Sequence, residues 1–276
     1  MIARGCGACP LRAFLVILLY LAAAAAAAHA ARRETARAPH AEPAAWLALA
    51  AILLHGAWLY QALRPFGDAT LSLADSASLM GFAIGAGGML AAIAPRFRGV
   101  AAVLLGLAAL LAAGTGSLPE PGSPLAAGWP FALHVVLAMG AAGMFAIAAI
   151  LVLLLSLQDA ALRRRAPAAW LGALPPVESL ERALFVVLAT GMAALTVAIA
   201  AGLLFVTDLF AQHLMHKTVL ALAAWLIFAV LLIGRWRRGW RGRKAARYTL
   251  AGFGLLAVAY FGSKFVLEVL LGRHWG

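Results

Sequence analysis

Histidine is the residue type in this chain that is best suited to chemistry. Of the seven histidines, His55 and His134 fall inside apolar stretches, and His213 and His216 directly precede another apolar stretch. A neutral imidazole is a ligand for haem iron, zinc, copper or nickel. An ionisable side chain within a membrane span marks a functional site or a hydrogen bond between helices. Each histidine taken alone is open to both interpretations.

The elements that must position these histidines are apolar stretches of membrane-spanning length. The chain is 65% hydrophobic and only 12% charged, whereas a soluble domain has roughly 25% charged residues. A bilayer crossing needs about 20 apolar residues in a helix. We therefore predict an all-α fold, a polytopic membrane helix bundle of about eight transmembrane helices, and exclude a soluble fold. The predicted spans are 13–30, 44–62, 71–94, 97–114, 129–157, 184–207, 217–234 and 248–271.

The basic residues predict the orientation of the bundle. Most lysines and arginines lie in the connections after the first, third, fifth and seventh spans, and the connection 235–247 is the richest. By the positive-inside rule these connections are cytoplasmic, so both termini are predicted to be periplasmic. The net charge of +12 is then explained by topology and contact with membrane lipids, and we do not predict nucleic-acid binding.

The N-terminal segment has two interpretations. Residues 1–30 resemble a secretory signal, with Arg4 and Arg12 before an apolar core and Ala28-His29-Ala30 as a cleavage site. Cleavage there would invert every later connection and place the basic connection 235–247 outside, against the positive-inside rule. A retained first helix is therefore favoured. We divide the chain into residues 1–43, the first helix with its basic loop, and residues 44–276, the main transmembrane domain.

His55 and His134 are predicted to lie at nearly the same depth. Counted from the outer ends of their spans, they lie roughly 10 Å and 8 Å deep at 1.5 Å per residue. His213 and His216 are expected in an outward loop above this level. Two imidazoles from different helices can hold a porphyrin, whose apolar ring suits a helix bundle.

The acidic residues and the last span bear on which cofactor these histidines hold. A zinc site would need a compact set of Cys, Asp or Glu ligands, and only Asp68, Asp75 and Asp208 are near the outer face, so haem is the better match. In the last span, Lys264 either pairs with Glu268 four residues later or meets a haem propionate.

Several stretches of the chain resemble one known family. Residues 207–220 read TDLFAQHLMHKTVL, 239–243 read GWRGR and 259–264 read AYFGSK. Residues 133–135 (LHV) and 174–181 (LPPVESLE) add to the match. These stretches resemble the YpjD and HemX branch of the cytochrome c assembly protein family. The resemblance extends from about residue 44 onward.

The resemblance implies a role in haem handling. The branch is similar to the CcsA and CcmC haem-handling proteins, in which membrane-embedded and periplasmic histidines ligate haem on its way to apocytochrome c. It implies a bacterial inner-membrane location, with haem as cofactor and other cytochrome c maturation proteins as partners. By position, His55 and His134 correspond to the membrane histidines that ligate haem iron, and His213 or His216 to an outer-face histidine. The family's tryptophan-rich W-G-x-x-W-x-W-D signature does not occur in this chain.

Two other functions compete with haem handling. In a transporter or transport accessory protein without cofactor, the outer histidines with Asp75 and Asp208 would line a proton or cation path; the absence of inverted hydropathy repeats argues against it. In a membrane oxidoreductase, Cys6 and Cys9 would form a redox pair, but they lack the βαβ context of such motifs. Since no catalytic nucleophile or acid–base pair emerges, we do not predict an enzyme.

Overall fold

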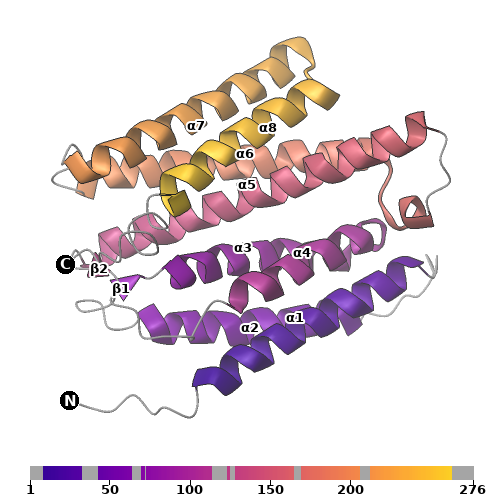
Figure 1. Ribbon diagram of the computed structural model, residues 1–276, viewed down its shortest axis with the longest axis horizontal. Coiled ribbons are helices and arrows are strands. Elements are labelled where there is room, and N and C mark those ends of the chain that lie inside the picture. Colours follow the sequence, from indigo (N-terminus) through magenta and orange to yellow (C-terminus); the bar gives the residue numbers. More distant parts are fainter. Residues whose placement is uncertain are drawn as a thin grey trace. The chain divides into compact units, whose positions relative to one another are not determined.

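The computed structural model describes residues 9–32, 43–63, 70–71, 73–113, 123–124, 128–164, 169–205 and 212–262. Helices dominate this part of the chain (Figure 1), which confirms the predicted all-α fold. The long helices are α1 (Cys9–Arg32), α2 (Pro43–Leu63), α3 (Leu73–Ile93), α4 (Arg98–Ala112), α5 (Gly128–Arg163), α6 (Val177–Phe205), α7 (Gln212–Arg238) and α8 (Gly242–Ala257). The short elements are η1 (Pro95–Phe97), η2 (Ala169–Ala173), the π-helical turn η3 (Val258–Gly262) and the strands β1 (Thr70–Leu71) and β2 (Ser123–Pro124).

Within the described residues, seven helical segments have the length and apolar composition of membrane spans; they lie in α1, α2, α3, η1 with α4, α5, α6 and α7. The chain is therefore a multi-pass membrane protein. Helix α8 has 16 residues and continues into η3. The predicted eighth span, 248–271, ends beyond the described residues.

The chain divides into two compact units. Unit 1 contains α1 to α4 together with η2, and unit 2 contains α5 to α8. In unit 1, α1 packs on α2 and α4, and α3 packs on α2 and α4. Helix α1 buries Val16, Tyr20, Ala23 and Ala27, whose spacing places them on one face. Alanine on that face lets neighbouring helices approach closely, as is common in membrane bundles.

Unit 2 is centred on stacked aromatic rings. Helix α5 packs on α6 and α8, and α7 packs on α6 and α8. The ring of Phe145 on α5 stacks on Phe228 of α7 with centroids 3.8 Å apart. On α8, a Cβ placed at Gly252 would lie 2.7 Å from Cζ of Phe228, so the glycine leaves room for this ring. The Trp225 indole N–H donates to Thr196 Oγ1 at 3.0 Å, which links α7 to α6.

Several helices extend beyond the predicted apolar stretches. Helix α5 continues to Arg163, and α6 begins at Val177 instead of near residue 184. The added turns carry the ion pairs Asp159–Arg163 and Glu178–Arg182, both spaced i,i+4. Such pairs stabilise a helix that continues into water. An apolar stretch in the sequence therefore marks the membrane-spanning part of a helix and not the full length of that helix.

Candidate functional site

His55 lies in the core of unit 1, between three helices. Its side chain is 0% exposed. The Nε2 atom lies 2.7 Å from Ser78 Oγ on α3, and Nδ1 lies 3.2 Å from Tyr20 Oη on α1. A neutral imidazole has one N–H donor and one acceptor nitrogen. In either tautomer, one hydroxyl therefore donates to the ring and the other accepts from it.

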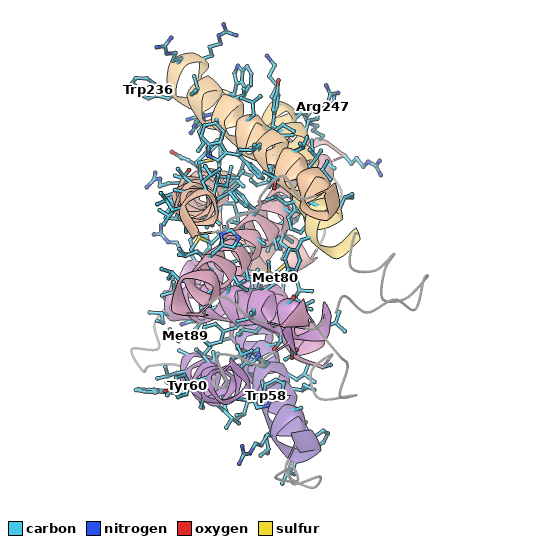
Figure 2. The ribbon with its side chains drawn as sticks, turned by 90° about the vertical axis from the view of Figure 1, so that its left-hand side faces the viewer. Trp58, Tyr60, Met80, Met89, Trp236 and Arg247 are labelled. Atoms are coloured by element: carbon cyan, nitrogen blue, oxygen red, sulfur yellow. The ribbon has the colours of Figure 1, made fainter. Side chains whose placement is uncertain are left out.

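Aromatic rings enclose the same imidazole. Trp58 on α2 stacks on His55 at 6.0 Å between centroids, and Phe82 on α3 meets it edge-on at 5.7 Å. Tyr20 also meets the His55 ring edge-on at 5.8 Å. Gly85 on α3 makes room for Tyr20, because a Cβ there would lie 2.6 Å from Tyr20 Oη. In the same turn of α2 as Trp58, Tyr60 is exposed and projects away from the helix (Figure 2).

Sequence reasoning identified His55 but missed its two hydroxyl partners. Tyr20 and Ser78 are both 0% exposed. Each is a hydroxyl residue within a span, and a polar atom in such a place needs a partner because the bilayer core offers no water. That signal is present in the sequence. The pairing itself depends on how α1, α2 and α3 pack.

His134 lies in unit 2, where α5 packs against α6. Its Nδ1–H donates to the backbone carbonyl oxygen of Ala198 at 2.7 Å. Gly202, one turn further along α6, accommodates the ring, since a Cβ there would lie 3.0 Å from His134 Cε1. With the proton on Nδ1, the lone pair of the neutral ring is on Nε2. Metal-ligating histidines usually donate their other N–H to a carbonyl or carboxylate in this way.

The hydrogen bond at His134 is of the kind that metal-ligating histidines make with their other ring nitrogen. The Ala198 carbonyl orients the His134 ring and sets its tautomer. At His55, Ser78 and Tyr20 engage both ring nitrogens, so iron would have to replace one of these hydroxyls. The rings of Tyr20, Trp58 and Phe82 pack against the His55 imidazole itself.

The other predicted site residues lie at or beyond the edge of the described structure. His213 and His216 were expected in a loop, but that expectation is wrong, because α7 already begins at Gln212. Their backbones lie about one turn apart on one side of the helix; their side chains are outside the described part. Lys264, Glu268, Asp68, Asp208 and Cys6 lie outside the described residues. Asp75 is half-buried in the first turn of α3.

The end of unit 2 away from His134 is charged. Glu181, near the start of α6, binds Arg235 at 3.2 Å and Arg241 at 3.3 Å. Ala198, the partner of His134, lies about 25 Å further along α6 at 1.5 Å per residue. Within unit 2, the basic end and the histidine are therefore separated by most of a bilayer thickness. The sequence predicted that the basic end and His134 lie on opposite sides of the membrane. It did not identify Glu181, which pairs with Arg235 of α7 and with Arg241 directly before α8.

The chain is similar to several bacterial proteins. It is 33% identical over 138 residues to the inner membrane protein YpjD of Escherichia coli K12, which covers 50% of this chain and 52% of that protein. It is 35% identical over 142 residues to a 28.8 kDa protein of Azospirillum brasilense, covering 51% and 52%. It is 31% identical over 100 residues to the cytochrome c biogenesis protein CcsA of Synechococcus elongatus, covering 36% and 31%.

These alignments are partial, and the family match is longer. The chain spans about half the length of the first two relatives and about a third of the third. No solved structure matches the chain. The model of the cytochrome c assembly protein family matches residues 13–271, which include α1 from residue 13 onward, all of α2 to α8, and both His55 and His134. The chain therefore belongs to the cytochrome c assembly protein family.

Proposed function

We propose that this chain is a haem-binding protein of the bacterial inner membrane that assists cytochrome c assembly by handling haem at the periplasmic face. Family membership and the names of the relatives YpjD and CcsA support this assignment. The observation that carries it is the bond from His134 Nδ1–H to the Ala198 carbonyl at 2.7 Å. That bond prepares a membrane-embedded imidazole as an iron ligand. We propose other cytochrome c maturation proteins as partners and no enzymatic activity for the chain.

The proposed haem-iron ligands are His55 and His134. We propose His213 or His216 as a secondary or alternative ligand at the outer surface, and Lys264 as a partner for a haem propionate. Two imidazole ligands would favour low-spin iron. The neutral imidazole ligands would be supplied by helices that also shield the porphyrin from water.

Ligation by His55 would require a rearrangement within unit 1. If His55 held iron through Nε2, the Ser78 hydroxyl would need another partner, and Nδ1–H would donate to Tyr20 Oη, which lies 3.2 Å away. Tyr20 would thereby take the orienting role that the Ala198 carbonyl has at His134. In this arrangement both proposed ligands would donate Nδ1–H to an oxygen atom. The acceptor would be the Tyr20 hydroxyl at His55 and is the Ala198 backbone carbonyl at His134.

The absorption spectrum of the purified protein tests the haem proposal. We expect the full chain, expressed in cells supplied with a haem precursor and purified in detergent, to show a Soret band and low-spin α and β bands. A pyridine haemochrome assay measures the haem bound per protein. An unrelated multi-pass protein purified from the same cells is the control for adventitious haem. A Soret signal no greater than this control would contradict the proposal.

We also propose that both termini are periplasmic and that the connection 235–247 is cytoplasmic. The separation of the basic end of unit 2 from His134 supports this orientation, because basic residues favour the cytoplasmic side. Alkaline phosphatase fused after Gly276 is expected to be active, and green fluorescent protein fused after Gly239 is expected to be fluorescent. A stable but inactive phosphatase fusion after Gly276 would overturn the orientation.

A further inference from the structure

The turn that joins α7 to α8 gathers basic side chains in a short space. We name residues 235–247 the basic turn. Gly239 and Gly242 have φ values of 63° and 55°, a conformation that glycine adopts without strain. The Gly239 N–H donates to the Arg235 carbonyl at 3.1 Å, and the Trp240 N–H donates to the Gly234 carbonyl at 3.3 Å. This glycine-ended helix terminus reverses the chain sharply, so the last turn of α7 and the first turns of α8 lie together.

The carboxylates at this end of unit 2 are already engaged. Glu181 binds Arg235 and Arg241. The pairs on the neighbouring helices are Asp159–Arg163 and Glu178–Arg182. None of the ion pairs found among the described residues uses the remaining basic side chains of the turn, which are exposed: Arg237, Arg238, Arg243, Lys244 and Arg247. The basic turn therefore presents an excess of positive charge.

Aromatic rings place this charge at the level of the membrane surface. Trp240 packs over Gly234 and lies 5.2 Å from the Tyr248 ring, with Lys244 Nζ 5.5 Å from the Trp240 centroid. Trp236 is 82% exposed and points outward from α7, while Arg247 extends from α8 (Figure 2). Tryptophan and tyrosine concentrate at the membrane–water interface. We therefore expect the basic side chains to lie at the level of the lipid headgroups.

Exposed apolar side chains adjoin the basic turn. Ile233 lies one turn before Trp236 on α7, and Leu250 lies one turn after Arg247 on α8; both are exposed. A ligand that contacts the arginines and these side chains together must carry a negative group and a hydrocarbon chain. A soluble anion would use only the charges, whereas a phospholipid matches both features.

We propose that the basic turn is a binding site for an anionic phospholipid. Arg238, Arg243 and Arg247 hold the headgroup phosphate, because a guanidinium donates two parallel hydrogen bonds to phosphate oxygens. Trp236 packs at the boundary between headgroup and acyl chain. Within unit 2 the site is separate from His134, and the proposal does not depend on haem binding.

Lipid titration of the detergent-purified full chain tests this site. Phosphatidylglycerol or phosphatidylcholine with identical acyl chains is added, and binding is followed by native mass spectrometry and by thermal unfolding. The wild-type protein is expected to prefer phosphatidylglycerol. The triple variant Arg238→Gln, Arg243→Gln, Arg247→Gln is expected to bind phosphatidylglycerol roughly 100-fold more weakly, since each basic residue near a membrane surface contributes about a five-fold effect.

A second triple variant is the matched control. Arg163→Gln, Arg164→Gln and Arg182→Gln remove the same charge from the α5 and α6 ends, where the ion pairs are exposed and contribute little to stability. This variant is expected to keep the preference for phosphatidylglycerol. If both triple variants lost the same amount of affinity for phosphatidylglycerol, the proposal would be overturned, because such a result would reflect general attraction by net charge.

Two further results would also overturn the proposal. The first is equal binding of phosphatidylglycerol and phosphatidylcholine by the wild-type protein. The second is equal stabilisation by inorganic phosphate, which has no acyl chain. If the glutamine variant does not fold, Arg→Lys changes at the same three positions serve instead. Lysine keeps the charge but cannot donate the two parallel hydrogen bonds of a guanidinium. We then expect about ten-fold weaker binding of phosphatidylglycerol, and unchanged affinity would contradict the arginine assignment.

Discussion

The double variant His55→Ala with His134→Ala is expected to lose the low-spin bis-histidine haem spectrum of the purified protein. Both residues are proposed axial ligands, and alanine offers no atom that coordinates iron. Absorption spectroscopy and the pyridine haemochrome assay measure the result. Each single variant should remove one ligand and shift or abolish the low-spin bands. His213→Ala or His216→Ala should lower haem occupancy more mildly.

Two variants at His55 distinguish ligation from packing. Ser78→Ala removes the hydroxyl 2.7 Å from Nε2, and Tyr20→Phe removes the hydroxyl 3.2 Å from Nδ1. If His55 binds iron, Ser78→Ala is expected to retain the haem spectrum, and Tyr20→Phe to weaken haem binding about 10- to 100-fold through loss of the orienting bond. If the double histidine variant keeps the haem spectrum and content of the wild type, the ligand assignment is wrong. Both histidines would then serve helix packing, a role worth about 0.6 to 2 kcal/mol per hydrogen bond.

Gly99→Ala is expected to destabilise unit 1 by about 1–3 kcal/mol through overpacking. A Cβ at Gly99 in α4 would run into the carbonyl oxygen of Ala173 in η2. Because this contact is with backbone, no side-chain rotation relieves it, and α4 or η2 must move. Thermal unfolding in detergent, followed by circular dichroism or by tryptophan fluorescence, measures the loss.

Gly106→Ala is the control for this change. Gly106 lies in the same helix, and a Cβ there meets nothing within 4 Å. Alanine has the higher helix propensity, by about 1 kcal/mol in a soluble helix interior. Gly106→Ala should therefore leave the unfolding temperature equal to or above that of the wild type. Equal unfolding temperatures for Gly99→Ala and the wild type would show that η2 yields at little cost.

The membrane spans are the part of the fold that was predictable from the sequence. Apolar runs of about 20 residues are a local signal, because each helix satisfies its own backbone hydrogen bonds within the bilayer. The predicted spans 71–94 and 97–114 leave only Pro95 and Arg96 between them, and the structure has the 3-10 helix η1 at this point. The helix ends were less predictable, since polar turns such as that from Gln212 to His216 continue α7 beyond its apolar part.

The candidate sites, like the fold, were predictable from the sequence only in part. The sequence by itself determined that His55 and His134 are histidines within membrane spans, and it placed the basic residues at one end of the helices, because hydropathy and charge are properties of individual residues along the chain. Only the tertiary structure decided that Tyr20 and Ser78 bind His55, that the Ala198 carbonyl orients His134, and that Glu181 joins Arg235 to Arg241. These partners come from different helices, and the rotation and depth of each helix are set by side-chain packing against its neighbours, which no local pattern in the sequence encodes.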